Sequence, residues 1–521
     1  MKKSDFLDKL DRKSLVSWLE LRAEGSAFNW AGWDRILFGI LLLALSAHFV
    51  LYLYSAYKNM PFPYEFKGWC GDHMIHESWL LSRGQNFYVD ASQQVSTAYS
   101  YTPIFQFLNA PLVRIFGPQM WTGRVVAVAG LVLVWGLLYL VAARMTGSRI
   151  YGLVAAGLLM ATYTTLDSHF DDIHPDSWCV GLGLLSLMLS EAALRKNRFW
   201  LFPAVLAAVL CYFAKQPGLS FALGAVIYLL INRPRYALAY LAMLCGLLLI
   251  GYVIGQILTG GMFWRYTIIS PSKLPILFHM IPKVGFFFLF NFSLGAIFVF
   301  YLLMDRPRSL PLNSPYLLAL PLVFFFYGSA SVRHGGTLSS NFFPAMALGA
   351  IVVAVALKEV RSRISPSEPK VAFLLLAVLI LQNVVLLQNL PKWPSKQHYQ
   401  TAEQMAKMVR DTPGPVLVYY RIAFAYLNGK EVYDNLNEIW ENYWWMDLSR
   451  LESQLRQQYF SRILILKKAV DLSLPNPRMM ELLQEKYELE TSILYPPWYQ
   501  TTPMLVYRPK FRPPVSPAEQ K

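Results

Sequence analysis

The chain has 521 residues, of which 55% are hydrophobic and only 15% are charged, against roughly 25% charged in an ordinary soluble domain. This composition excludes a disordered chain and argues against a soluble cytosolic enzyme. The net charge of +15 does not indicate a nucleic-acid partner, because the basic residues stand in short clusters between apolar runs. Long apolar runs recur from residue 36 to residue 390, and we therefore predict a polytopic membrane protein with a soluble tail.

Residues 1–35 contain no apolar core of a signal peptide, so the first span must serve as its own insertion signal. They interleave apolar side chains with lysines and arginines, which predicts a basic amphipathic segment on the cytoplasmic membrane surface. The cysteines have no metal-ligand spacing, and most fall in or beside apolar runs, so we expect small core residues. They are Cys70, Cys179, Cys211 and Cys245.

Eleven apolar runs of about 15 to 23 residues are candidate membrane-spanning helices. In chain order they cover 36–57, 125–143, 150–166, 177–194, 199–213, 217–231, 236–258, 284–304, 314–328, 338–357 and 371–389. A further run at 103–118 is short, carries Arg114 and contains Pro111. It could span the membrane or lie at its surface.

The arginine-rich loops decide between these two interpretations, because basic residues in short loops favour the cytoplasmic side. With eleven spans and a cytoplasmic N-terminus, all five such loops fall inside; they hold Arg144 and Arg149, Arg195 to Arg198, Arg233 and Arg235, Arg306 and Arg308, and Lys358 to Lys370. Counting 103–118 as a span would place them all outside, so we predict that it is an interfacial helix in the first external loop.

The soluble tail, 391–521, then lies outside the membrane. Helical patterns at 401–410 and 449–459 alternate with apolar strand patterns at 416–420, 462–466 and 504–507. We therefore predict a small α/β domain after a transmembrane domain of residues 36–390.

Acidic residues gather in the first two external loops. The segment GDHMIHE places four ionisable groups within six residues: Asp72, His73, His76 and Glu77. On a helix, Asp72 and His76 share a face, and the group could supply a general base with an orienting partner. The alternative is a solvated loop in which Asp72 caps a helix.

The second external loop, DSHFDDIHPD, adds further carboxylates and a histidine: Asp171, Asp172, His174 and Asp176. Together with Asp72 they could bind a divalent metal ion, since hard cations prefer carboxylates. The alternative for Asp176 is again an N-cap.

Basic residues stand in the later external loops. Lys215 lies between two short spans, where an ammonium is costly unless it meets a phosphate or a carboxylate; snorkelling to ordinary head groups is the alternative. Arg333 and His334, in a Gly-rich loop, could approach a phosphate or face water.

The aromatic residues of the first loop could stack on sugar rings, but aromatic side chains are enriched at any membrane interface. We therefore expect membrane-belt residues at Trp69, Trp79, Tyr88, Tyr99 and Tyr101. Inside the spans, His48 and Glu191 are nearly the only ionisable groups, which argues against an ion-coupled transporter.

From about residue 60 to residue 360 the chain resembles the integral-membrane glycosyltransferases of the GT-C superfamily. The resemblance is to the bacterial branch related to protein mannosyltransferases and lipid A aminoarabinose transferases (glycosyltransferase families 39 and 83). The similar segments follow one another in the family's order: GDHMIHE, LLSRGQNFY, YTP, Gly123-Arg124, FDDIHPDS and AKQPG.

The resemblance implies a mainly α GT-C-like bundle that transfers a hexose or pentose from a polyprenyl-phosphate donor to an external glycan, lipid or protein acceptor. Asp72 is similar to the family's catalytic aspartate, and Asp171 and Asp172 to residues that bind a divalent metal in some members. Lys215, with Arg333, would hold the donor phosphate. Many relatives have adjacent Asp and Glu, whereas Asp72 and Glu77 are five residues apart here, which leaves open which carboxylate is the base.

Two other functions stay open at this point. A transporter or flippase for lipid-linked saccharides would need polar residues lining a path through the spans. A polysaccharide polymerase or ligase would share the lipid donor but would rely on external arginine and histidine. No nucleotide-binding loop is evident, and we expect a multi-pass protein of the bacterial cytoplasmic membrane.

Overall fold

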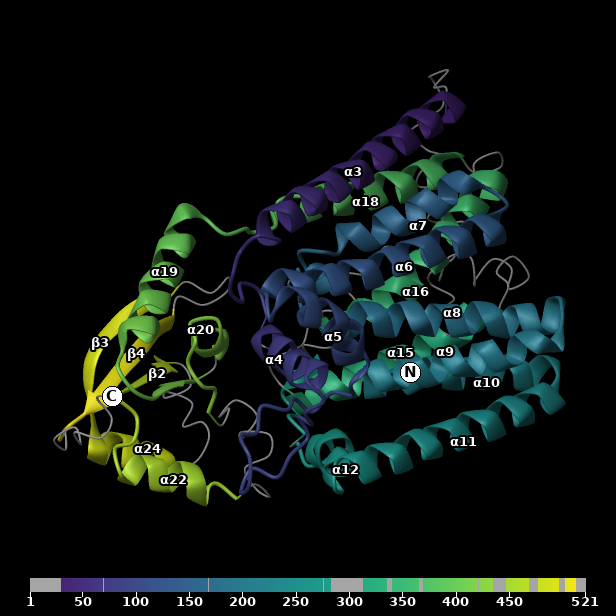
Figure 1. Ribbon diagram of the computed structural model, residues 1–521. Coiled ribbons are helices and arrows are strands. Elements are labelled where there is room, and N and C mark those ends of the chain that lie inside the picture. The colour runs from purple at the N-terminus through teal and green to yellow at the C-terminus, as the bar shows by residue number, and fades with distance from the viewer. Residues whose placement is uncertain are drawn as a thin grey trace, which may run out of the picture.

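The structure is a computed structural model that describes residues 30–68, 70–166, 168–274, 276–282, 313–334, 340–364, 369–419, 421–433, 447–467, 477–495 and 502–511. Figure 1 shows a bundle of long, roughly parallel helices with a smaller sheet-containing domain at one end. The predicted span at 284–304, Trp69 and nearly all of the predicted N-terminal segment lie outside the described residues.

Each of the ten predicted spans within the described residues coincides with a helix. The helices are α3 (Trp30–Asn59), α6 (Met120–Thr146), α7 (Arg149–Ala161), α8 (Asp176–Arg195), α9 (Leu201–Ala214), α10 (Leu219–Asn232), α11 (Pro234–Leu258), α15 (Pro315–His334), α16 (Phe343–Glu359) and α18 (Pro369–Leu386). Among the described helices, six are long and apolar enough to cross a membrane. The protein is therefore an integral multi-pass membrane protein, and the count of eleven spans stays a prediction.

The helix α5 (Ile104–Phe116) covers the run that was ambiguous in the sequence. Its 13 residues span about 20 Å, less than the roughly 30 Å of a hydrocarbon core. It packs against α4 (Gly71–Ser82) at the end of the bundle nearest the sheet domain. Its place at this end of the bundle agrees with a helix that does not cross the membrane, whereas its length does not set it apart, because α7 also has 13 residues.

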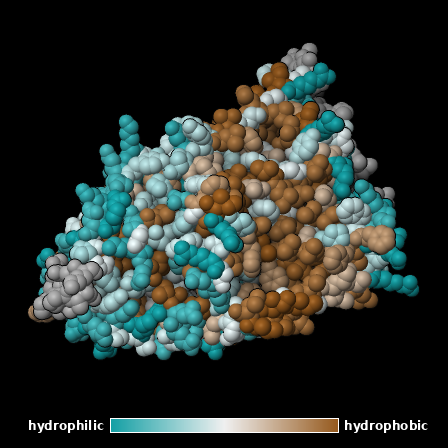
Figure 2. Space-filling view, viewed as in Figure 1, coloured by the Kyte–Doolittle hydropathy of each residue, from teal (hydrophilic) through white to brown (hydrophobic). Residues whose placement is uncertain are grey.

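The two ends of the bundle are polar, and a hydrophobic surface lies between them (Figure 2). At the end away from the sheet domain, Arg144 and Arg195 both pair with the buried Glu191. There, too, Arg361 Nη2 lies 2.8 Å from Asp34 Oδ2. These arginines belong to three of the loops predicted on the cytoplasmic side, so those loops do gather at one end.

Few polar groups interrupt the bundle interior. Nε2 of His48 is hydrogen-bonded to the backbone oxygen of Asn383 at 2.9 Å, which joins α3 to α18. Cys179 and Cys211 are buried core residues, as expected, and Cys70 is buried in the first loop; Cys245 is exposed. The described part of the bundle offers little ionisable chemistry away from its ends.

Arg124, near the start of α6, fixes the path of the chain from α3 into the first loop. Its buried guanidinium donates hydrogen bonds to the backbone oxygens of Asn59, Met60, Phe62 and Tyr64. A charged donor satisfied by several carbonyls is strongly held. The Gly-Arg pair noted in the sequence is thus an anchor for the first loop.

The tail folds into a domain with a four-stranded sheet in the order β1-β2-β4-β3. β1 (Val416–Val418) is parallel to β2 (Arg462–Leu466), while β4 (Thr502–Pro509) is antiparallel to β2 and to β3 (Tyr487–Tyr495). Its helices are α19 (Lys396–Asp411), α20 (Ala423–Tyr426), α22 (Ser449–Arg456) and α24 (Pro477–Lys486). The predicted α/β domain is confirmed, although α20, α24 and β3 were not predicted.

Candidate functional site

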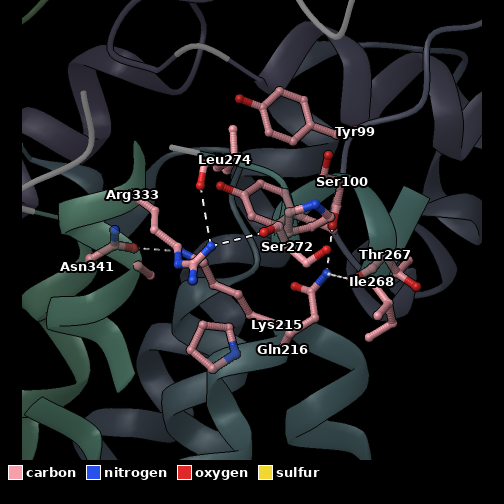
Figure 3. A pocket seen from close by; sticks show the side chains of 14 residues that line it. Tyr99, Ser100, Lys215, Gln216, Thr267, Ile268, Ser272, Leu274, Arg333 and Asn341 are labelled. Atoms are coloured by element: carbon pink, nitrogen blue, oxygen red, sulfur yellow. Dashed lines mark hydrogen bonds between the residues drawn. The ribbon is translucent and has the colours of Figure 1, made fainter. Parts of the chain in front are cut away.

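A cavity of about 340 Å³ opens where the ends of α9 and α15 meet the first loop (Figure 3). Its polar lining includes Lys215, Gln216, Arg333 and Asn341. Lys215 follows the last residue of α9, at the point where the backbone becomes extended. The predicted phosphate-binding residues Lys215 and Arg333 therefore share one cavity, and the side chain of His334 lies outside the described residues.

Lys215 is 5% exposed and is held by polar partners. Its ammonium donates hydrogen bonds to Asp176 Oδ1 at 2.7 Å and to Asn341 Oδ1 at 3.2 Å, and lies 5.3 Å from the centre of the Tyr101 ring. A buried lysine is stable only with such partners. Three helix ends and the first loop thus fix this cation.

Asp176 connects the second loop to the cavity. It is the first residue of α8, whose N-cap is Pro175, so the expectation that it caps the helix is wrong. It pairs instead with Lys215 and with His174, whose ring also bonds the Tyr101 hydroxyl at 3.1 Å. Burial lowers the pKa of His174, against the opposing effect of Asp176.

Arg333 closes the other side of the cavity. Its Nη1 donates to the backbone oxygens of Ser272 at 3.0 Å and Leu274 at 3.3 Å. With Lys215 positive and Asp176 negative, the named groups leave one excess positive charge at the cavity. Such a site favours an anion with a single negative charge.

Asp72 lies in the first turn of α4 and is 1% exposed. Its Oδ2 accepts the Ala423 backbone N–H at 3.3 Å, and its Oδ1 lies 3.9 Å from the Arg421 guanidinium. Cys70 is the N-cap of α4, so the alternative that Asp72 caps the helix is wrong. Burial raises the pKa of Asp72 to about 6, against the opposing effect of Arg421.

The other ionisable residues of α4 have separate partners. His76 Nδ1 is bonded to Thr97 Oγ1 at 3.0 Å, so it does not act as the partner of Asp72 that helical spacing suggested. Burial lowers the pKa of His73 to about 3 and that of His76 to about 4. Both rings are therefore neutral at neutral pH.

Glu77 holds the segment that lines the cavity. Its carboxylate accepts the Tyr99 N–H at 2.8 Å and the Gln106 side-chain amide at 2.5 Å. Burial raises its pKa to about 7. Because both oxygens accept hydrogen bonds, Glu77 is a structural support for Tyr99.

The acidic residues of the second loop are also paired. Asp171 accepts hydrogen bonds from Lys67 at 3.0 Å and from the Tyr163 hydroxyl at 2.7 Å. Asp172 is bonded to His169 Nδ1 at 3.1 Å. Within the described ranges, no group of three or more His, Cys, Asp or Glu side chains could hold a metal ion. The metal ion expected at Asp72, Asp171 and Asp172 stays a prediction.

Two site residues were missed in the sequence. Glu65 is buried, its Oε1 accepts the Gly68 N–H at 3.0 Å, and burial together with Asp172 raises its pKa to about 8. The nearby glycines Gly68 and Gly71 could have hinted at a crowded backbone, since a Cβ on Gly71 would meet Glu65 Oε2 at 1.8 Å. Nothing in the sequence indicated a role for Arg421, because it belongs to the tail and lies far along the chain from Asp72.

The aromatic residues are placed differently from the expectation. Tyr88 and Tyr99 are buried, so the membrane-belt prediction is wrong for them. Tyr99 and Tyr101 stack with ring centres 4.9 Å apart and both line the cavity. Trp79 does not line this cavity. The Arg83 guanidinium lies over its ring, 4.0 Å from the ring centre.

Comparison with known families agrees with this architecture. Residues 100–270 match the family model of dolichyl-phosphate-mannose-protein mannosyltransferases. The matched segment includes Lys215 and the second loop but begins after Asp72. Over these residues the chain is therefore similar to the protein mannosyltransferases, in agreement with the resemblance seen in the sequence.

Solved structures define the fold more closely. The chain is similar to ArnT from Cupriavidus metallidurans bound to undecaprenyl phosphate, with 12% identity and a TM-score of 0.54. It is similar to the apo state of the same protein with 13% identity and a TM-score of 0.50. Each match covers 90% of this chain and 98% of the other. No curated protein sequence matches the chain. The chain therefore shares the fold of ArnT over nearly its whole length.

Proposed function

We propose that the protein is a membrane glycosyltransferase that moves a sugar from a polyprenyl-phosphate donor to an acceptor hydroxyl. The observation that carries the proposal is the basic cavity of Lys215 and Arg333 at the end of a GT-C bundle. The ArnT structure with undecaprenyl phosphate supports a lipid phosphate as the ligand. The acceptor would be a glycan, lipid or protein outside the bacterial cytoplasmic membrane, with the N-terminus of the chain inside.

The charge of the cavity suits such a donor. A sugar linked to a polyprenyl phosphate is a phosphodiester with one negative charge, and Lys215, Arg333 and Asp176 together supply one excess positive charge. After transfer, the leaving lipid phosphate gains negative charge, which the same cations stabilise more strongly. The site therefore favours the charge that develops during the reaction.

Asp72 is the better candidate for the general base. Both oxygens of Glu77 accept hydrogen bonds, whereas Asp72 Oδ1 accepts none from the described residues. The acceptor hydroxyl would give its proton to Oδ1 while its oxygen bonds to the anomeric carbon. The bond from that carbon to the phosphate oxygen breaks, and its electron pair leaves with the lipid phosphate.

The phosphate cavity and Asp72 have a common neighbour in Tyr99. This residue lines the cavity, and its ring centre is 6.5 Å from that of His73, the residue next to Asp72. A sugar that extends from the phosphate past Tyr99 would approach the start of α4. That path would join the two halves of the site.

The test uses the purified full-length protein in detergent with undecaprenyl-phosphate-linked hexoses and pentoses, and measures release of undecaprenyl phosphate. Lys215→Met should raise the donor KM about 10- to 100-fold, because a hydrogen bond to a charged group is lost. Lys407→Met, at an exposed position of α19, is the matched control. The proposal is overturned in favour of a transporter if no donor releases undecaprenyl phosphate and the protein instead moves a lipid-linked saccharide across vesicle membranes.

A further inference from the structure

The short helix α20 of the tail docks on the first external loop. The rings of Phe424 and Tyr64 stack with centres 4.0 Å apart, and Tyr426 stacks on His76 at 5.7 Å. The Tyr426 hydroxyl also donates to the backbone oxygen of Asp72 at 3.2 Å. These contacts fix the tail domain against α4 (Figure 1).

Within this contact, the tail surrounds the Asp72 carboxylate. Arg421 Nη1 donates to the Gly68 backbone oxygen at 3.2 Å and lies 3.9 Å from Asp72 Oδ1. The Ala423 N–H bonds Oδ2 at 3.3 Å. The Arg421 side chain is only 4% exposed, so its charge acts on Asp72 with little screening by water.

We propose that Arg421 is a positioning residue for Asp72: from the tail domain, it holds the buried carboxylate in the orientation that takes the proton of the acceptor. This inference rests on the proposed function, in which Asp72 is the base. Ala423 fixes one carboxylate oxygen, and Arg421 stabilises the charge beside the other. The tail domain then supplies part of the active site.

The remaining charged groups around Asp72 do not replace Arg421. Glu65, from the loop before α4, has a pKa raised to about 8 and is neutral at neutral pH. Arg124, from α6, also lowers the pKa of Asp72, but less than Arg421 does, and its guanidinium is bonded to four backbone oxygens. His73 and His76 are neutral, and the pKa of Tyr426, from α20, is raised well above its ordinary value by burial. Arg421 is therefore the main stabiliser of the Asp72 anion.

The first measurement is the pH profile of kcat/KM for release of undecaprenyl phosphate by the full-length protein. The wild type should lose activity as the pH falls through about 6, because the base becomes protonated. Arg421→Gln should move this acidic limb upward by about 1 to 3 pH units, as expected for loss of a nearby opposite charge. Arg421→Lys should reverse most of the shift, and the donor KM should stay unchanged in both variants.

The matched control is Arg462→Gln, which removes an arginine that is paired with Glu490 elsewhere in the tail domain. It should leave the acidic limb where it is. If Arg421→Gln also leaves the limb in place, or if Arg421→Lys fails to reverse the shift, the positioning role is overturned.

A second measurement does not depend on turnover. The Tm loss caused by Arg421→Gln is compared in the wild-type and Asp72→Asn backgrounds. A smaller loss in the Asp72→Asn background, where the amide side chain has no charge to stabilise, supports the proposal, and equal losses overturn it. If no donor is turned over by the wild type, the proposed function fails, while this double-mutant cycle still decides whether Arg421 acts on Asp72.

Discussion

The basic cavity and the acidic cluster are built in different ways. Lys215 and Arg333 stand at the ends of bundle helices, and the partners of Lys215 come from neighbouring helix ends. Asp72 is covered by a segment that lies 351 residues further along the chain. The cavity should therefore depend on the bundle helices and the first loop, whereas the acidic cluster should depend also on docking of the tail. Variants of each region test this contrast.

The largest effect is expected from Asp72→Asn, on the acidic side. It should lower turnover about 10²- to 10⁴-fold, the usual contribution of a general base, without raising the donor KM. Asparagine can still accept the Ala423 N–H, so the fold should persist. Turnover of undecaprenyl-phosphate-linked sugar is the measurement, and Asp90→Asn, in the same loop, is the control. Full activity of Asp72→Asn would remove the assigned base.

Gly71→Ala should destabilise the acidic cluster while leaving the bundle intact. The new Cβ would meet Glu65 Oε2 at 1.8 Å, and crowding of this kind costs about 1–3 kcal/mol. The expected result is a lower Tm in a detergent unfolding experiment. Gly136→Ala, in α6, is the matched control, because nothing lies within 4 Å of its added Cβ. Equal Tm values for both variants would contradict the tight packing of the cluster.

Arg333→Gln tests the basic side. We expect the donor KM to rise about tenfold, because one charged contact to the phosphate is lost, with kcat little changed. Arg265→Gln, at an exposed position before the same loop, should have no effect. A change in kcat alone would mean that Arg333 acts on the reacting atoms and not on donor binding.

The smallest effect concerns the pH dependence of stability. The folded-state pKa of Glu65 is raised from 4.5 to about 8, so the native state holds a proton that the unfolded state releases. Its stabilising contribution is present at low pH and is lost as the pH rises through about 8. Glu65→Gln should therefore make the fall of Tm between about pH 5 and 8 shallower, and Glu490→Gln should not. An unchanged slope in Glu65→Gln would show that Glu65 is already ionised.

Long apolar runs made the bundle predictable, because about 20 apolar residues have few alternatives to a helix across a bilayer. The strand 462–466 was also predicted, since its apolar run is short and rich in isoleucine and leucine. β3 was missed because its sequence, YELETSILY, mixes charged and apolar residues and only Tyr487 and Ile493 are buried in its described part.

Part of the site was predictable because a charged residue stands out beside an apolar run. Lys215 stands out in the sequence as a cation between two apolar runs, and Asp176 stands at the start of another. The neighbours of Asp72 could not be inferred, because the pairing of Arg421 with the first loop depends on how two distant segments dock. Spacing along the chain also misplaced His76, whose partner is Thr97 and not Asp72.

The contact between α20 and α4 also orders events during biosynthesis. Residues 30–68 and the bundle helices are made before residue 421 exists, so Lys215 can find Asp176 while synthesis continues. The carboxylate of Asp72 acquires its arginine only after the tail has been synthesised and has folded against the first loop. A nascent or truncated chain would thus hold a complete phosphate cavity beside an unfinished base, and catalysis would begin only with the finished polypeptide.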